Sequence, residues 1–221
     1  SAERPVEKVL IVAVSSNRGL CGGFNSNINK QVINLATKTY AGKQVTVIGI
    51  GKKSADFLGK RGYNVAAKHN AVFDNLNFEA IAPIAEEIMA AYVAGTYDRV
   101  DIVYNHFKNA ATQACLTEQF LPVAPPVQTE KKASTDYIFE PEKAEIVQDL
   151  IPRSLKTQLY KAVLDSHASE HGARMTAMHK ATDNASELLK ELKLSYNKAR
   201  QASITNEILE IVGGAADLED G

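Results

Sequence analysis

The stretch MTAMHKATDNASELLKELKLSYNKAR, residues 175–200, belongs to a helical segment that is too long for a protein of this size to bury. Between residues 153 and 218 there is no proline and glycine is rare. We therefore expect one helix from about residue 145 to 218. At ~1.5 Å per residue it spans on the order of 100 Å, whereas a globule of this length is a few tens of Å across. Most of the helix is expected to extend beyond the globular part, where its apolar face needs a partner.

Apolar and small residues recur along this helix with gaps of three and four in alternation, which is the heptad pattern of a left-handed coiled coil. A single solvated helix is the alternative, but it would be only marginally stable in water. No second heptad segment of comparable length occurs in the sequence, so the partner is expected to be another chain or a segment that this chain has lost. The seam consists of Met175, Met178, Thr182, Ala185, Leu189, Leu192, Tyr196, Ala199 and Ser203.

The composition indicates a globular protein with a proper core. Its 221 residues suit one or two domains, and 45% of them are hydrophobic. The net charge of −1 gives no field that would draw the chain to nucleic acid or to anionic lipid. Cys21 and Cys115 lie far apart in no metal or redox spacing, which favours a reduced, intracellular protein. No apolar run in the sequence is long enough to span a membrane, and we expect no signal peptide.

The first 121 residues alternate strands with helices, the pattern of an α/β fold with a mainly parallel sheet. The nearly continuous apolar run at Val6–Ser15 predicts a strand that is buried on both faces. The other expected strands are Val45–Ile50, Tyr63–Ala67, Val100–His106 and Ala114–Leu121, and the expected helices are Asn25–Tyr40, Ser54–Lys60 and Asn77–Ala94.

The segment Leu121–Thr135 contains three prolines and a polar tail, so we expect a loop that leaves the sheet, followed by a short strand at Asp136–Phe139. Pro141 suits the first turn of a helix, and Pro152 is expected to kink or break that helix. The predicted fold is a Rossmann-like α/β globular domain at residues 1–140, with a long C-terminal coiled-coil helix at 141–221.

Two glycine-rich turns were tested as nucleotide sites. Gly19, Gly22 and Gly23 follow the first strand, but their spacing is G-x-x-G-G, and no acidic residue ends the second strand. A tight turn that packs a helix on the sheet is favoured over phosphate binding. The stretch GIGKKS at residues 49–54 lacks the first glycine of a P-loop, and its lysines are expected to begin a solvated helix.

The segment His167–His171 matches the zinc-protease pattern H-x-x-E-H, and two histidines four apart share a helix face. It lies on the long helix rather than in a cleft, without an evident third ligand, so packing or hydrogen bonding at a helix interface is favoured. Ser16 and the two cysteines have no nearby histidine or acid to form a nucleophile system. No catalytic, cofactor-binding or metal residue is therefore assigned.

The end of the chain changes character. An apolar tip follows the seam and needs an apolar socket elsewhere, with a frayed tail as the alternative. Polar side chains flank this tip. The apolar residues are Ile204, Ile208, Ile211 and Val212, and the polar ones are Arg200, Gln201, Thr205 and Glu207.

Three segments together resemble the gamma subunit of F-type ATP synthase. They are the glycine turn Asn17–Asn25, the helical stretch from Ala168 to Met178 with Ala181–Ala185, and the terminal signature from Ile204 to Ala215. Members of that family begin with a long helix that pairs antiparallel with the C-terminal one. This chain lacks that helix, and we expect the intact protein to have it.

The resemblance implies a non-catalytic rotor shaft without cofactors, on which a ring of alpha and beta subunits changes conformation as the c-ring turns. The implied partners are the alpha, beta and epsilon subunits and the c-ring, with neither nucleic acid nor membrane insertion. The implied location is peripheral, on the cytoplasmic face of a bacterial plasma membrane or the matrix or stroma face in an organelle.

The resemblance also implies subunit-contact residues. Arg200, Gln201, Thr205 and Glu207 match polar contacts to a loop of the ring, with Ile204 and Ile208 beside them. Arg174 matches a position near the lower rim, which the turn with Arg18 and Cys21 is also expected to face. The alternatives are a nucleotide-binding α/β enzyme with an oligomerising helix and a coiled-coil adaptor unrelated to energy conversion.

Overall fold

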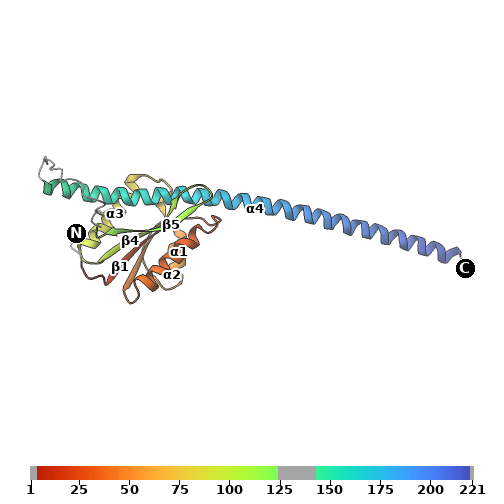
Figure 1. Ribbon diagram of the computed structural model, residues 1–221. Helices are drawn as coiled ribbons and strands as arrows, with labels where there is room; N and C mark the ends of the chain where they lie inside the picture. The colour runs from red at the N-terminus through yellow and green to blue at the C-terminus, as the bar shows by residue number, and fades with distance from the viewer. Residues whose placement is uncertain (1–3, 124–142, 220–221) are drawn as a thin grey trace, which may run out of the picture. The chain divides into compact units, whose positions relative to one another are not determined.

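The computed structural model describes residues 4–123 and 143–219 (Figure 1). The expected strand at Asp136–Phe139 and the helix start at Pro141 lie outside these residues. The elements are β1 (Lys8–Val14), α1 (Phe24–Asn34), the π-helical turn η1 (Leu35–Thr39), β2 (Gln44–Ile50), α2 (Lys52–Lys60), β3 (Asn64–His69), the 3-10 turn η2 (Ala71–Phe73), α3 (Phe78–Val93), β4 (Arg99–Phe107), β5 (Gln113–Leu121) and α4 (Lys143–Glu219).

The strands of the described residues form one sheet in the order β3-β2-β1-β4-β5. β1 pairs in parallel with β2 and β4, and β2 pairs in parallel with β3. β5 runs antiparallel beside β4. The central position of β1 explains its nearly continuous apolar sequence, because both of its faces are covered. The predicted α/β fold with a mainly parallel sheet and a long C-terminal helix is confirmed.

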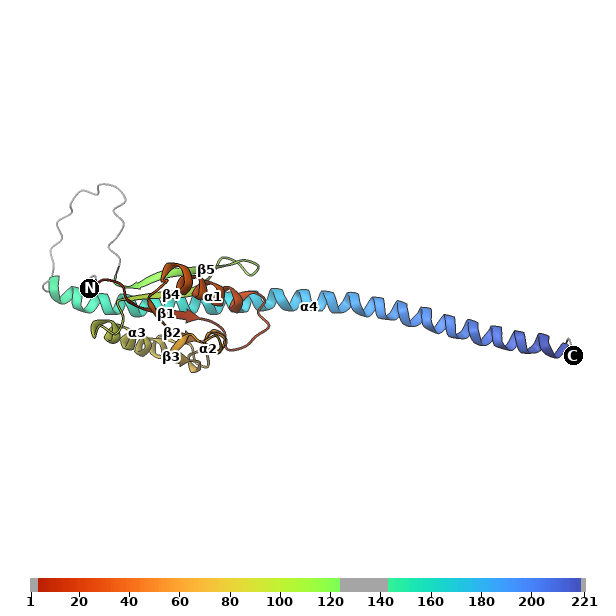
Figure 2. The same ribbon diagram turned by 90° about the horizontal axis from the view of Figure 1, so that it is seen from below.

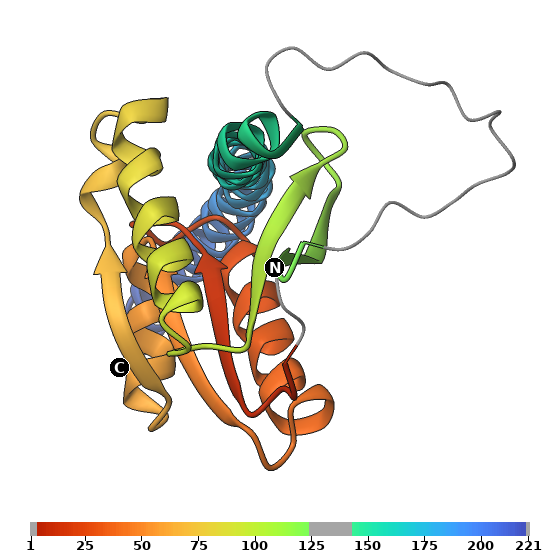
Figure 3. The ribbon, with the colours of Figure 1, turned by 90° about the vertical axis from the view of Figure 1, so that its left-hand side faces the viewer.

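Alternate residues of β1 enter two different cores. Leu10, Val12 and Val14 lie in a cluster with residues of α3 and α4, whereas Val9 and Ile11 lie in a cluster with residues of α1 and α2. Helices α3 and α4 therefore cover one face of the sheet, and α1 and α2 cover the other (Figure 3).

The long helix is one continuous element through Pro152. We predicted a kink or a break at this proline, and the structure contains no break. Proline removes the N–H that would bond to the carbonyl of Gln148, but Gln148 is exposed, so water can satisfy that carbonyl. Packing of the next turns also holds the helix, since Leu155 and Leu159 are buried.

The first part of α4 belongs to the globular core. It runs beside β4 and β5 (Figures 1 and 2), and Leu155, Leu159, Ala162 and Val163 join the cluster on that face of the sheet. Compactness accordingly divides the chain into residues 1–176 and 177–221, rather than at the predicted residue 140. The part of α4 that extends beyond the core is therefore shorter than the heptad pattern indicated.

Candidate functional site

The turn between β1 and α1 is a tight loop with two residues in the left-handed backbone region. Leu20 has a φ of 64° and Gly22 a φ of 57°. Such a φ is unfavourable for a residue with a Cβ, so the surrounding loop must hold Leu20 in place. The Leu20 side chain is 79% exposed. The turn therefore displays an apolar side chain to solvent.

Arg174 of α4 fixes this turn against the helix. Its guanidinium donates to the carbonyl oxygen of Gly19 at 3.1 Å and to the carboxylate of Glu170 at 2.6 Å. Glu170 is only 9% exposed, so this charged pair is shielded from solvent. The turn thus presents carbonyl oxygens to a cation, whereas a phosphate loop presents N–H groups to an anion. This geometry supports the prediction of a packing turn over that of a phosphate site.

Replacing Arg174 by alanine is expected to lower the free energy of unfolding by about 1–3 kcal/mol, because the shielded carboxylate of Glu170 loses its charged partner. Urea denaturation followed by circular dichroism measures this change. Lys180→Ala is the matched control, since Lys180 is an exposed cation on the same helix. Equal stability losses in the two variants would contradict the proposed hold on the turn.

The hairpin between β4 and β5 meets α4 at Gly172. A Cβ at this position would lie 3.1 Å from the Cα of Ala110, which is shorter than nearly all Cβ contacts in proteins. One turn later, the Thr176 hydroxyl donates to the carbonyl of Ala110 at 3.1 Å. Ser169 likewise donates to a carbonyl of β4 at 2.9 Å. The glycine turn and the hairpin therefore converge on the same stretch of α4, residues 169–176.

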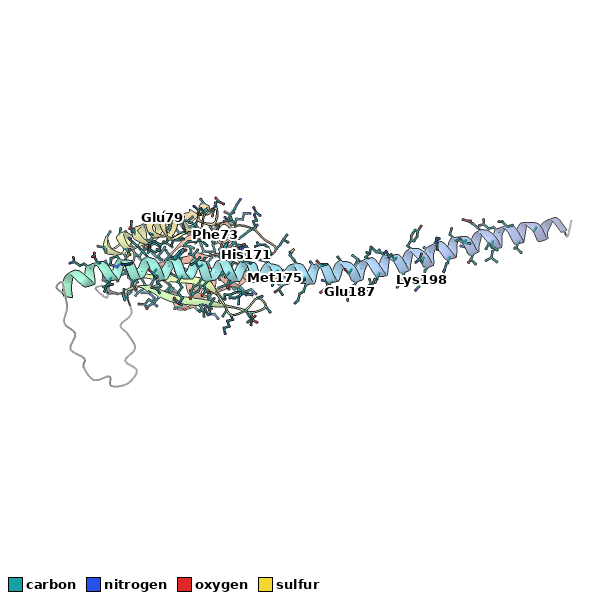
Figure 4. All side chains as sticks on the ribbon, turned by 90° about the horizontal axis from the view of Figure 1, so that it is seen from above. Phe73, Glu79, His171, Met175, Glu187 and Lys198 are labelled. Atoms are coloured by element: carbon teal, nitrogen blue, oxygen red, sulfur yellow. The ribbon has the colours of Figure 1, made fainter. Side chains whose placement is uncertain are left out.

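Beyond that stretch, α4 forms a unit of its own without a core. All described side chains from Met178 to Ala215 are exposed, among them the labelled Glu187 and Lys198 (Figure 4). An apolar stripe without cover is the property that the heptad pattern predicted. The exposed large apolar side chains here are Met178, Leu188, Leu189, Leu192, Leu194, Tyr196, Ile204, Ile208, Leu209, Ile211 and Val212.

The predicted contact residues fall into two groups. Arg18, Cys21 and Arg174 belong to the α/β unit, where Arg18 is exposed but Cys21 is buried against Phe24 and Ala173. Any contact at Cys21 would therefore involve its neighbours in the turn. The other six residues lie on the exposed helical unit, and they are Arg200, Gln201, Ile204, Thr205, Glu207 and Ile208.

The polar residues of the second group keep their side chains available. Arg200 and the amide of Gln201 donate to no other residue in the described part of the chain. The Thr205 hydroxyl donates to the carbonyl of Gln201 within the helix at 2.8 Å, and Glu207 accepts from Ser203 at a long 3.4 Å. These side chains can bind a partner without breaking a strong internal interaction.

The cysteines have structural environments. Both are free thiols, Cys21 is buried, and burial raises the pKa of Cys115 to about 11. A thiol with that pKa is almost entirely protonated at neutral pH and is a poor nucleophile.

The H-x-x-E-H motif behaves as the sequence analysis favoured. Glu170 accepts from Arg174. His167 stacks on Phe73 of η2 and contacts His171. No cluster of three or more metal-binding side chains occurs within residues 4–123 and 143–219. In the structure the motif therefore takes part in packing and hydrogen bonding.

Three features of this region were not predicted from the sequence: the exposure of Leu20, the close approach at Gly172 and the ion pair that Arg174, itself a predicted contact residue, forms with Glu170. Leu20 was passed over because nothing in a turn sequence marks the side chain at its tip. Gly172 was noted only as a helix glycine, since its close neighbour Ala110 is distant along the chain. The pair of Glu170 and Arg174 could have been found from its i, i+4 spacing, which favours ion pairs on a helix.

Together, the fold and these surfaces define an α/β unit and a long helix with an exposed apolar seam, the class of protein that forms part of a larger assembly. Within the described residues, no helix has both the length and the apolar character needed to cross a bilayer.

Comparison with known proteins identifies the family. A family model described as ATP synthase matches residues 1–218. The ATP synthase gamma chain of Flavobacterium johnsoniae is 62% identical over 219 residues, which cover 99% of this chain and 76% of that protein. The gamma chain of Cytophaga hutchinsonii is 52% identical over 225 residues, with 99% and 76% covered. The chain belongs to the ATP synthase gamma-subunit family, and is a non-catalytic subunit of the central stalk of F-type ATP synthase.

Solved structures share the fold. A chain of the mitochondrial ATP synthase of Euglena gracilis, solved with OSCP, F1 and c-ring, has a TM-score of 0.73 at 24% identity, over 98% of this chain and 74% of that one. A chain of the central stalk and c-ring structure from Tetrahymena thermophila has a TM-score of 0.61 at 27% identity, over 82% and 79%. Both matches show that these chains share the fold described here.

Proposed function

We propose that this chain is the rotor shaft that couples rotation of the c-ring to conformational change in a hexamer of alpha and beta subunits. Solved structures that share this fold include an ATP synthase rotor and a central stalk with its c-ring. The observation that carries the proposal is the uncovered seam from Met178 onward, since a helix with an exposed apolar stripe is stable only when other protein covers it.

The proposed shaft is the helix at residues 141–221, paired with a second, antiparallel helix along the seam. Leu189 and Leu192 lie three residues apart and are each more than half exposed. Side chains with this spacing insert between those of a facing helix. A coiled coil is stiff along its axis, and a shaft needs stiffness to transmit torque.

The polar residues near the tip are proposed to contact a loop of the hexamer. Arg200, Gln201, Thr205 and Glu207 supply exposed donors and acceptors, and Ile204 and Ile208 supply apolar area. A rotor needs contacts that form and break as it turns, and exposed hydrogen bonds of modest strength meet that need.

The α/β unit is proposed to lie near the lower rim of the hexamer, with the epsilon subunit and the c-ring. Arg18 and Leu20 project from the turn that Arg174 holds, so they are the groups most available there. Cys21 would support this contact from beneath. The proposed location is peripheral, on the cytoplasmic face of a bacterial plasma membrane or the equivalent face in an organelle.

Coupling follows when the shaft's angle changes the relative free energies of the conformations of the catalytic subunits. An asymmetric shaft makes different contacts with each subunit around the ring, and this difference biases each conformational equilibrium. The chain needs no catalytic group or cofactor of its own for this role.

Replacing Arg200 by alanine or Gln201 by leucine in the assembled complex is expected to lower proton-driven ATP synthesis about two- to tenfold. This range corresponds to losing a hydrogen bond worth about 0.5–1.5 kcal/mol. ATP synthesis in energised membrane vesicles measures the effect. Neither variant should change the unfolding of the isolated chain, because both side chains are exposed.

Asn206→Ala is the matched control. Asn206 is an exposed polar residue in the same two turns, and at about 100° per residue it lies on the opposite side of the helix from the proposed contact face. It should leave ATP synthesis unaltered. Normal synthesis in both Arg200→Ala and Gln201→Leu would reject the proposed contact.

A further inference from the structure

Two histidines on α4 are held with their ring nitrogens close together. His167 and His171 lie four residues apart, and their Nε2 atoms are 3.2 Å from each other. Their rings are nearly perpendicular, with centroids 4.5 Å apart. The ring of Phe73 in η2 stacks on that of His167, with ring centroids 5.7 Å apart and an interplanar angle of 16°. The stack limits the rotamers of His167 and orders the pair before any ligand arrives.

We propose that His167 and His171 form a two-nitrogen chelating site for a divalent transition metal of the zinc, nickel and copper group. Zinc–nitrogen bonds are ~2.0–2.1 Å long, so two nitrogens at a tetrahedral angle are separated by roughly 3.3 Å. The observed 3.2 Å matches that separation without rearrangement of the helix. A metal ion bridging the two Nε2 atoms would occupy the apex of the wedge that the rings form.

The two Nε2 atoms share a hydrogen bond in the structure, in which one ring donates to the other. A nitrogen that binds a metal must present its lone pair, so the donating ring would carry its proton on Nδ1 in the metal-bound pair.

The proposed metal site is accessible to solvent and is not a catalytic centre. His171 is exposed, so a hydrated ion can reach it. Among the described residues no third metal-binding side chain completes a cluster, and water fills the remaining coordination positions. Imidazole pairs select late divalent metals, in the order copper above nickel and zinc, and bind magnesium and calcium poorly.

Metal binding at this pair would stabilise the helix where it packs on Phe73. A ligand that binds only the folded state raises stability in proportion to its occupancy. The bridge would join two successive turns of α4 immediately before Arg174, which holds the glycine turn. The metal would thus stiffen the part of the shaft that meets the α/β unit.

The test is titration of the full-length subunit, prepared without a polyhistidine tag, with Ni²⁺ and Zn²⁺ by isothermal calorimetry. One high-affinity ion per subunit is expected, with Mg²⁺ giving no heat. His171→Gln and His167→Gln should each lower the association constant at least tenfold. Cu²⁺ bound to the unmodified protein should give an electron paramagnetic resonance spectrum with coupling to two nitrogens.

His179→Gln is the control, because His179 is an exposed histidine on the same helix with no histidine one turn away. It should bind metal as the unmodified protein does. His171→Gln removes no buried side chain, so it remains informative if His167→Gln disturbs folding. Unchanged nickel affinity in His171→Gln, or an equal loss in His179→Gln, would overturn the proposal.

Discussion

Replacing Leu159 by alanine is expected to lower the free energy of unfolding of the α/β unit by about 2–5 kcal/mol. Leu159 is 0% exposed and lies in the cluster that joins α4 to β1, β4 and α3. Truncation removes its transfer free energy and leaves a cavity that the sheet, held by its hydrogen bonds, cannot collapse to fill. The loss would be a large part of the stability of a typical domain.

Urea denaturation of the isolated chain, followed by the fluorescence of tyrosine and by circular dichroism, measures this loss. Leu164→Ala is the matched control, because Leu164 lies on the same helix but is 40% exposed. Leu164→Ala should lower the free energy of unfolding by clearly less than Leu159→Ala does. If the two variants were equally stable, the first part of α4 would not belong to the core of the unit.

The sheet was predictable because its sequence signals are local. The apolar run of β1 predicted a strand with two covered faces, and Asn77 predicted a helix start that the structure contains, with the Asn77 side chain accepting from the N–H of Ala80 at 2.8 Å. Each signal depends on residues within a few positions, which is why the strands and helices appear within a few residues of their expected bounds.

The role of the first half of α4 could not be predicted in the same way. Leu155, Leu159 and Ala162 continue the apolar periodicity that later becomes the seam. Helical periodicity tells which face of a helix is covered, but a sheet and a second helix give the same pattern. The sequence therefore indicated an apolar stripe that must be buried. It did not show which part of the stripe packs on the chain's own sheet.

In the candidate site, too, some features could be predicted from the sequence and others depend on contacts between distant residues. The exposed residues near the tip were predicted from their resemblance to a family, and their side chains have few partners within the described part of the chain. Arg174 was recognised too, but its bond to the carbonyl of Gly19 joins positions 155 residues apart in sequence. Contacts of that kind, like the approach of Ala110 to Gly172, depend on the folded arrangement.

Replacing Leu192 by glutamate is expected to prevent the seam from pairing with another helix. An unpaired charge at a covered seam position costs about 3–5 kcal/mol, which corresponds to a loss of more than a hundredfold in association. The measurable result is loss of assembled ATP synthase and of ATP synthesis in membranes that carry the variant. The 221-residue chain alone is expected to self-associate through its exposed seam, and sedimentation should show that the variant does not.

Leu194→Glu provides the sharpest comparison. Leu192 and Leu194 are similarly exposed, at 58% and 62%, and both become the same residue. They lie two positions apart, so about 200° of helix rotation separates them and only Leu192 lies on the seam. Both variants therefore show any general effect of the new charge on solubility or helix propensity. Only Leu192→Glu should also lose pairing with the partner helix. Equal assembly of the two variants would mean that the seam is not the face that meets the partner helix, and the proposed shaft would lose its physical basis.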